Sequence, residues 1–302
     1  MKKFIYNIIK YPLILIFIKT PLINILRKRF KFHRFLKSKN IFWFTLDVIF
    51  QKEYFNKLKD KKEIRKLTDL TYSDGEGRKS AEYYFNKHLK TLVNSKKKVG
   101  TMSASEASPI FDEMIKFIEI NILNNKQDTY IVQLGSSSGR DLEFFLKKYP
   151  KLNYISTDIN DEILNFQREN YNYHNLKFFK CYAEDIDLCM ENFNLYNKNI
   201  ILFSFGSLQY VNPFFLKEFF LKLNKIKKLN LFIEEPVSLN FIDHDKLISD
   251  NRANISFSHR YNEYLKNTKI NIKKYLNFKK SFLGPKVKSY KDFSDICGDY
   301  LI

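Results

Sequence analysis

The stretch from Ile131 to Asp141, IVQLGSSSGRD, decides the fold of this chain. It begins with an apolar run typical of a buried strand, passes through a turn bounded by Gly135 and Gly139, and continues into a helix. Doubly wound α/β domains use this order of strand, glycine turn and helix to hold a nucleotide-like cofactor. The spacing is Gly-x-x-x-Gly, which argues against the Gly-x-Gly-x-x-Gly turn of nicotinamide dehydrogenases.

Apolar runs alternate with helical patterns after this turn. Residues 141–149 have the apolar spacing of an amphipathic helix, which Pro150 ends, and Asn212-Pro213 is typical of the start of another helix. Strands are expected at residues 153–157, 176–181, 200–205 and 230–236. This alternation predicts a parallel sheet with crossover helices.

Asp158 stands at the tip of the second expected strand, at the distance from the glycine turn where ribose-binding acids occur. A carboxylate there can accept hydrogen bonds from both hydroxyls of a ribose. The alternative is that Asp158 caps the helix that starts near Asp161. We favour ribose binding because the glycine turn precedes it.

Residues 130–236 resemble class I S-adenosylmethionine-dependent methyltransferases, and most closely bacterial enzymes that modify sugars or lipid-linked glycans. Four motifs carry the resemblance in the right order: Val132 to Gly139, Asp158, Tyr182 to Asp185, and Phe203 to Val211. The resemblance implies an α/β, Rossmann-like, doubly wound and mostly parallel seven-stranded sheet, with a helical extension before it. It also implies S-adenosyl-L-methionine as the cofactor.

The resemblance assigns cofactor binding to one set of residues: Gln133, Gly135, Ser136, Ser137, Gly139, Asp158, Ile159, Ala183, Glu184, Asp185, Ser204, Phe205 and Gly206. The chain departs from the family at three positions. Gln133 stands where the family usually has an acid, Ser137 where it usually has a third glycine, and Tyr182 where it often has an acid that faces the adenine. These departures leave open a non-catalytic binding protein on the same fold.

Methyl transfer requires the acceptor to be aligned with the methyl group and water to be excluded, and a hydroxyl acceptor also needs a general base. Tyr210, after the fourth strand, is predicted to shape the acceptor pocket. Glu234, Glu235 and His259 are candidate bases. The alternatives are that the two glutamates are solvent-exposed and that His259 caps a helix.

The formal net charge of +19 raises the question of a nucleic-acid partner. The lysines are scattered, which argues against that partner, although an RNA or protein methyltransferase stays open as an alternative. Cys181, Cys189 and Cys297 show no paired metal spacing, so we expect no metal site and a reducing cytoplasm.

The sequence predicts three regions: an apolar and basic extension (1–60), a helical cap and lid region (61–126) and the cofactor-binding domain (127–302). Residues 4–26 are apolar, but no uninterrupted run approaches the roughly 20 residues of a spanning helix. We expect residues 4–37 to contact an anionic membrane surface at its inner face, or else to pack on the domain. The expected acceptor is a small molecule or a glycan hydroxyl.

Overall fold

The computed structural model describes residues 62, 64–65, 78–79, 81–83, 85–86, 109–123, 128–238, 248–253, 256–266, 268–270, 275–280 and 296–301. The chain divides into two compact units, and the second (72–250 and 257–302) holds the glycine turn and the sheet. The prediction for residues 4–37 lies outside the described residues, and the predicted cap and lid region (61–126) is described only in part. Within the described part, no helix has the length and apolar character needed to cross a membrane.

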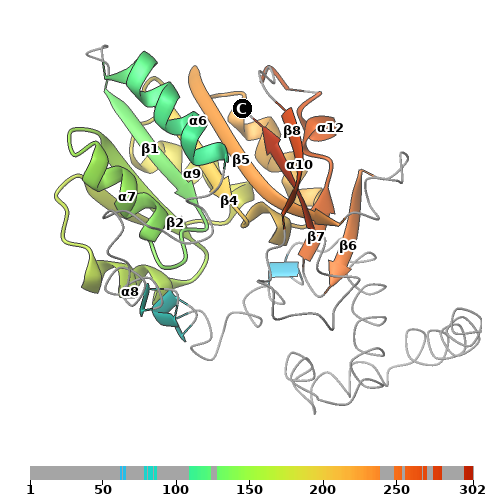
Figure 1. Cartoon of the computed structure of the whole chain (residues 1–302), viewed down its shortest axis with the longest axis horizontal. Helices are drawn as coiled ribbons and strands as arrows, with labels where there is room; N and C mark the ends of the chain where they lie inside the picture. Colours follow the sequence, from blue (N-terminus) through green and yellow to red (C-terminus); the bar gives the residue numbers. More distant parts are fainter. Residues whose placement is uncertain are drawn as a thin grey trace, which may run out of the picture. The chain divides into compact units, whose positions relative to one another are not determined.

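The central sheet is mostly parallel, which confirms the predicted Rossmann-like α/β class (Figure 1). Its described strands have the order β3-β2-β1-β4-β5-β9-β8. Their bounds are β1 Thr129–Leu134, β2 Asn153–Asp158, β3 Leu176–Lys180, β4 Asn199–Phe205, β5 Lys228–Ser238, β8 Tyr275–Lys280 and β9 Ile296–Leu301. Strands β1 to β5 are parallel, and β9 is antiparallel to both β5 and β8.

Strand β1 pairs with β2 on one side and with β4 on the other, so the strand order reverses at β1. In open α/β sheets, ligands bind outside the carboxyl ends of the strands at such a switch point. The glycine turn follows β1 directly, and the topology therefore places it at the expected crevice. Two further strands, β6 (Ser249–Ala253) and β7 (Ser256–His259), follow β5 along the chain.

Helices cover both faces of the sheet (Figure 1). One face packs against α6 (Pro109–Phe117) and α7 (Arg140–Lys148), and the other against α9 (Ile186–Asn192) and α10 (Pro213–Leu223). Further helical elements are η2 Ile118–Ile122, α8 Asp161–Asn170, η3 Ala183–Asp185, η4 Leu208–Tyr210 and α12 Tyr261–Leu265. Successive strand residues alternate between the two cores, as the pleat requires.

Asparagine side chains set the start of two helices. Asn160 caps α8 by accepting a hydrogen bond from the backbone N–H of Glu162 at 2.8 Å. Asn212 caps α10 in the same way, and Pro213 occupies the first turn, which confirms the helix start expected there. Because Asn160 caps α8, the alternative capping role for Asp158 is wrong.

Phenylalanine rings fill the core between α6, α7 and the sheet. Phe111 stacks on Phe145 with ring centroids 5.4 Å apart, and Phe203 meets the Phe145 ring edge-on at 5.9 Å. All three rings are almost fully buried. Such pairs are stabilising beyond the apolar area they bury, so the high aromatic content of the chain has a structural use here.

Two phenylalanines of α10 test the core on the other face of the sheet. Phe219 is fully buried, whereas 56% of Phe214 is exposed. We expect Phe219→Ala to lower the free energy of unfolding by about 3–5 kcal/mol, because it leaves a cavity in the core. Phe214→Ala on the same helix should change it by about 0.5 kcal/mol or less. Urea denaturation followed by circular dichroism checks both, and equal losses would contradict the assigned core.

Candidate functional site

The turn after β1 has an unusual backbone. Gly135, Ser137 and Gly139 all have positive φ, at 63°, 48° and 74°. Glycine adopts this left-handed region without a steric penalty, and a serine does so at some cost. Gly139 is the N-cap of α7, so the turn leads its backbone directly into the N-terminus of that helix.

Both glycines are also required by close approaches. A Cβ added to Gly135 would lie 2.3 Å from the Oγ atom of Ser207, and one added to Gly139 would lie 2.6 Å from the ring of Tyr171. The Ser207 hydroxyl donates a hydrogen bond to the carbonyl oxygen of Gly135 at 3.0 Å. The turn after β1 is thus packed against the segment that follows β4.

Helix α8 supports the turn from its other side. The Gln167 side-chain amide donates to the Ser136 hydroxyl at 2.8 Å and to the Ser137 carbonyl at 2.7 Å. The Tyr171 hydroxyl donates to the Ser138 carbonyl at 2.7 Å. The sequence did not predict these hydrogen bonds from Gln167 and Tyr171. Gln167 could have indicated them, because it is a polar residue on the buried face of an amphipathic helix.

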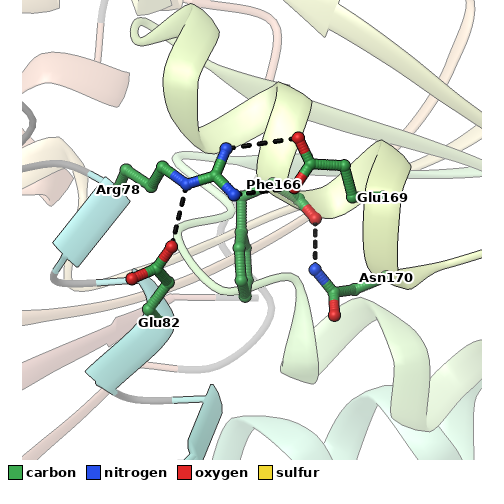
Figure 2. Close-up of polar contacts among 5 residues, drawn as sticks. All are labelled: Arg78, Glu82, Phe166, Glu169 and Asn170. Atoms are coloured by element: carbon green, nitrogen blue, oxygen red, sulfur yellow. Dashed lines mark hydrogen bonds and ion pairs between the residues drawn. The ribbon is translucent and has the colours of Figure 1, made fainter.

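The outer side of α8 carries a cluster of charges, which Figure 2 shows. The Arg78 guanidinium contacts Glu82 at 2.8 Å and Glu169 at 2.7 Å, and its central carbon lies 5.8 Å from the centre of the Phe166 ring. The Asn170 amide donates to the Phe166 carbonyl at 2.7 Å. Exposed ion pairs of this kind contribute little to stability, because water and salt screen them. The cluster attaches the segment around Arg78 to the helix that supports the turn.

Asp158 lies at the end of β2, where it touches the turn. Its Oδ2 atom accepts from the Ser137 backbone N–H, and its Oδ1 atom accepts from that of Asn160, both at 3.1 Å. The carboxyl group is almost fully buried, and this burial raises the pKa of Asp158 to about 6 despite the backbone donors. The residue therefore ties the turn to β2 while holding a carboxylate at the crevice.

Glu235, one of the candidate bases, binds the loop that follows β4. Its Oε1 atom accepts from the Ser204 hydroxyl at 2.6 Å and from the backbone N–H groups of Ser207 and Leu208 at 3.0 and 2.9 Å. Its Oε2 atom accepts from the Gln209 N–H at 3.1 Å. The side chain is fully buried, and burial raises the pKa of Glu235 to about 7. The alternative that Glu235 is solvent-exposed is therefore wrong.

The other candidate bases are also buried, and the pocket candidate is exposed. Glu234 is 1% exposed, so the alternative of solvent exposure is wrong for this residue as well. Tyr210 is 40% exposed at the end of η4. His259 is fully buried, and its Nδ1 atom lies 2.7 Å from the Ser249 hydroxyl, which in turn lies 2.6 Å from the hydroxyl of Tyr264. The N-cap of α12 is Arg260, so His259 is not the helix cap.

The predicted cofactor residues come from the carboxyl ends of four adjacent strands. The turn follows β1, Asp158 ends β2, η3 follows β3, and Phe205 ends β4. Hydrogen bonds join these strand ends, among them Ser137 to Asp158 across β1 and β2, and Ser207 to Gly135 across β4 and β1. Across the residues described, no group of three or more His, Cys, Asp or Glu side chains could hold a metal ion.

Comparisons with known proteins give structural matches only. No protein-family model matches the chain, and no curated protein matches it. A methyltransferase from Anabaena variabilis is 11% identical, with 73% of this chain and 93% of that chain covered and a TM-score of 0.46. A methyltransferase from Aquifex aeolicus is 15% identical, with 72% and 96% covered and a TM-score of 0.43. Both are described as S-adenosylmethionine-dependent.

A third solved structure, the CurJ carbon methyltransferase, is 13% identical over 83% of this chain and 69% of that chain, with a TM-score of 0.46. At such low identities, a structural match says nothing about substrates. The case for a function therefore rests on the residues at the crevice.

The contact between Gly135 and Ser207 predicts a specific pattern of stabilities. Gly135→Ala should lower the free energy of unfolding by at least about 2 kcal/mol, because the new Cβ strains a left-handed backbone and overlaps Ser207. Ser207→Gly removes the overlap, so the double variant should be more stable than the sum of the single variants predicts. Thermal unfolding of all four proteins measures this coupling, and simple additivity would contradict the contact.

Burial of Glu235 predicts a dependence of stability on pH. Folding raises its pKa from 4.5 to about 7, so its contribution is full below pH 4.5 and is lost as the pH rises through about 7. Glu235→Gln cannot ionise, so the variant should gain about 3 kcal/mol relative to wild type across this range. Its amide would still lose the bond to Gln209. Denaturant titrations of both proteins from roughly pH 5 to pH 8 measure the difference, and a flat difference would refute the assigned burial.

Proposed function

We propose that this chain is an S-adenosylmethionine-dependent methyltransferase that methylates a hydroxyl of a sugar or lipid-linked glycan. One observation carries the proposal: the left-handed glycine turn after β1 and the buried Asp158 carboxylate meet at the switch point of the sheet. Backbone N–H groups at a helix N-terminus and a carboxylate on the next strand suit a nucleoside cofactor.

The residues present fit such a cofactor. The turn after β1 leads into the N-terminus of α7, where backbone N–H groups without intrahelical partners favour an anionic group. The buried Oε1 atom of Gln133, which has no hydrogen-bond partner, lies at the foot of the same turn. Buried acceptors normally have a donor, and a bound ligand can supply one.

Each cofactor-binding role is proposed for a particular strand end. Asp158 would accept from the ribose hydroxyls, and Ala183 to Asp185 in η3 would lie beside the adenine. The turn itself would hold the amino-acid end, together with Ser204 to Gly206 after β4. When bound, S-adenosylmethionine supplies an electrophilic methyl group on a sulfonium.

The chain's own part in the reaction is to place the acceptor and take its proton. Tyr210 is proposed to contact the acceptor, because it is a half-exposed aromatic ring on the segment beside the glycine turn. Glu234 on the neighbouring β5, which pairs with Phe205 at the end of β4, is proposed as the base. His259 has no exposed surface, so it would act through Ser249 as a positioning residue.

The extension is proposed to bring the enzyme to its acceptor. Its cluster of basic and aromatic residues at 27–37 suits an anionic membrane surface, where lipid-linked glycans would be found. The proposed chain organisation has three regions: the extension (1–60), a cap and lid region (61–126) and the cofactor-binding domain (127–302).

Calorimetric titration with S-adenosylhomocysteine, run beside NAD, tests the cofactor. We expect micromolar binding of S-adenosylhomocysteine alone. Asp158→Asn should weaken it about tenfold or more, because it removes the charge that accepts from the ribose hydroxyls. The matched control is Asp161→Asn, which changes an exposed carboxylate on the first turn of α8.

The outcome of this titration decides whether the cofactor assignment holds. Binding of NAD in place of S-adenosylhomocysteine, or of neither, would overturn the methyltransferase proposal. If the cofactor binds, transfer of a labelled methyl group to glycan lipids rather than to RNA tests the acceptor class, and label in RNA would favour the alternative.

A further inference from the structure

The segment between β3 and α9 is short and depends on support from elsewhere in the fold. It contains η3, a 3-10 helix of three residues that starts at Ala183. The backbone N–H of Asp185 donates to the Tyr182 carbonyl at 3.0 Å to close this turn. The hydrogen-bond geometry of a 3-10 helix is poor, and a single turn gains little stability from it. Such a segment keeps one conformation when side chains of other elements fix its backbone.

Lys222, in the last turn of α10, supplies such a contact. Its Nζ atom donates to the carbonyl oxygen of Glu184 at 2.5 Å and to the Oδ1 atom of Asp187 at 2.8 Å. The carbonyl lies in the middle of η3, and the carboxylate lies in the first turn of α9. An ammonium group has three donors, so it can make both contacts at once. One side chain of α10 therefore holds the backbone of η3 and the start of the next helix.

The two contacts of Lys222 differ in what they fix. The side chains of Lys222 and Asp187 are 26% and 19% exposed, and partial exposure weakens the attraction between their charges. The Glu184 carbonyl precedes Asp185, the N-cap of α9, so it lies outside the regular hydrogen bonds of that helix. A charged donor makes a strong bond to such a carbonyl, and the bond holds main chain rather than a side chain. We therefore expect the carbonyl bond to set the position of η3.

Core packing fixes the helix that carries Lys222. Phe219 and Leu223 of α10 are buried on either side of it in the sequence. They belong to the same core cluster as Ile186 and Cys189 of α9. Because a close-packed core resists the rotation or sliding of a helix, the start of the Lys222 side chain has a defined position relative to η3.

The proposed function places the adenine of the cofactor beside η3, and this step rests on that proposal. Adenine has an amino donor at its 6-position, whereas hypoxanthine has an oxygen acceptor there. Telling the two apart requires protein acceptors that are held in position, because a hydrogen bond weakens steeply when its geometry is poor. A short segment such as η3 meets this requirement only if its backbone is fixed.

We propose that Lys222 is a positioning residue for purine recognition. From α10, it holds the backbone of η3 through the Glu184 carbonyl, so that this segment selects adenine over hypoxanthine. Lys222 acts through η3 and does not touch the cofactor. The ion pair with Asp187 orients the ammonium group and is not needed for the selection.

Calorimetry with S-adenosylhomocysteine and S-inosylhomocysteine, which differ at the 6-position of the purine, tests this role. We expect wild type to bind the adenine probe about tenfold more tightly than the hypoxanthine probe, or better. Lys222→Met keeps a long unbranched side chain and removes its donors, so it should reduce this preference to about threefold or less. The matched control Lys225→Met removes an exposed lysine just beyond α10 and should leave the preference unchanged.

A further variant separates the two contacts of Lys222. Asp187→Asn removes the charge of the ion pair and leaves the bond to the Glu184 carbonyl, so the preference should stay within about twofold of wild type. Thermal unfolding of each variant shows whether it is folded. If Lys222→Met does not fold, Lys222→Gln takes its place, because its shorter and uncharged side chain should lose the same preference.

The outcomes separate this inference from the proposed function. If wild type binds neither probe, the methyltransferase proposal fails. If wild type binds both probes equally, the cofactor site stands and the purine selection is refuted. If Lys222→Met weakens both probes by the same factor, or neither, Lys222 has a structural role only and the inference is refuted. An equal loss of preference in Asp187→Asn would overturn the role of the carbonyl bond.

Discussion

The site depends on the left-handed turn after β1 and on the buried hydrogen bonds that hold it. The turn is not stable by itself, because Ser137 takes a backbone conformation that serine avoids. Asp158 bonds its N–H, Gln167 bonds its carbonyl, and Ser207 bonds the carbonyl of Gly135. These contacts come from β2, α8 and the segment after β4, so the crevice can form only when the surrounding sheet and helices have assembled.

Carboxylates near the crevice have two different tasks. Glu235 is fully enclosed, and four donors surround it, so it organises the loop before Tyr210 and has no free surface for chemistry. Asp158 is slightly exposed at the carboxyl end of the same sheet, and it also accepts a hydrogen bond from the backbone N–H of Ser137 in the turn. Both have a raised pKa because burial outweighs their hydrogen bonds. A raised pKa therefore does not by itself distinguish a structural acid from a ligand-binding one.

Local patterns in the sequence predicted the strands, the glycine turn and the start of α10, because alternation, left-handed glycines and an Asn-Pro cap act within a few residues. Contacts between distant segments could not be predicted in this way. The burial of His259 depends on Ser249 and on aromatic neighbours that only the fold brings together. The hydrogen bonds of Glu235 to the segment after β4, and those of Gln167 to the glycine turn, also join segments that only the fold brings together. Alternation could place Glu234 and Glu235 on opposite faces of β5, but not say what covers each face.

The overlap between Gly135 and Ser207 links two positions that are far apart in the chain. No side chain fits at 135 while serine occupies 207, and a larger residue at 207 would push against the turn even with glycine present. Position 207 can therefore change only to another small residue, whereas position 135 is held to glycine both by Ser207 and by its left-handed backbone. Mutational drift at this contact is limited to small residues after β4, so descendants of this chain should vary elsewhere around the crevice, on the exposed side of Tyr210, before they vary here.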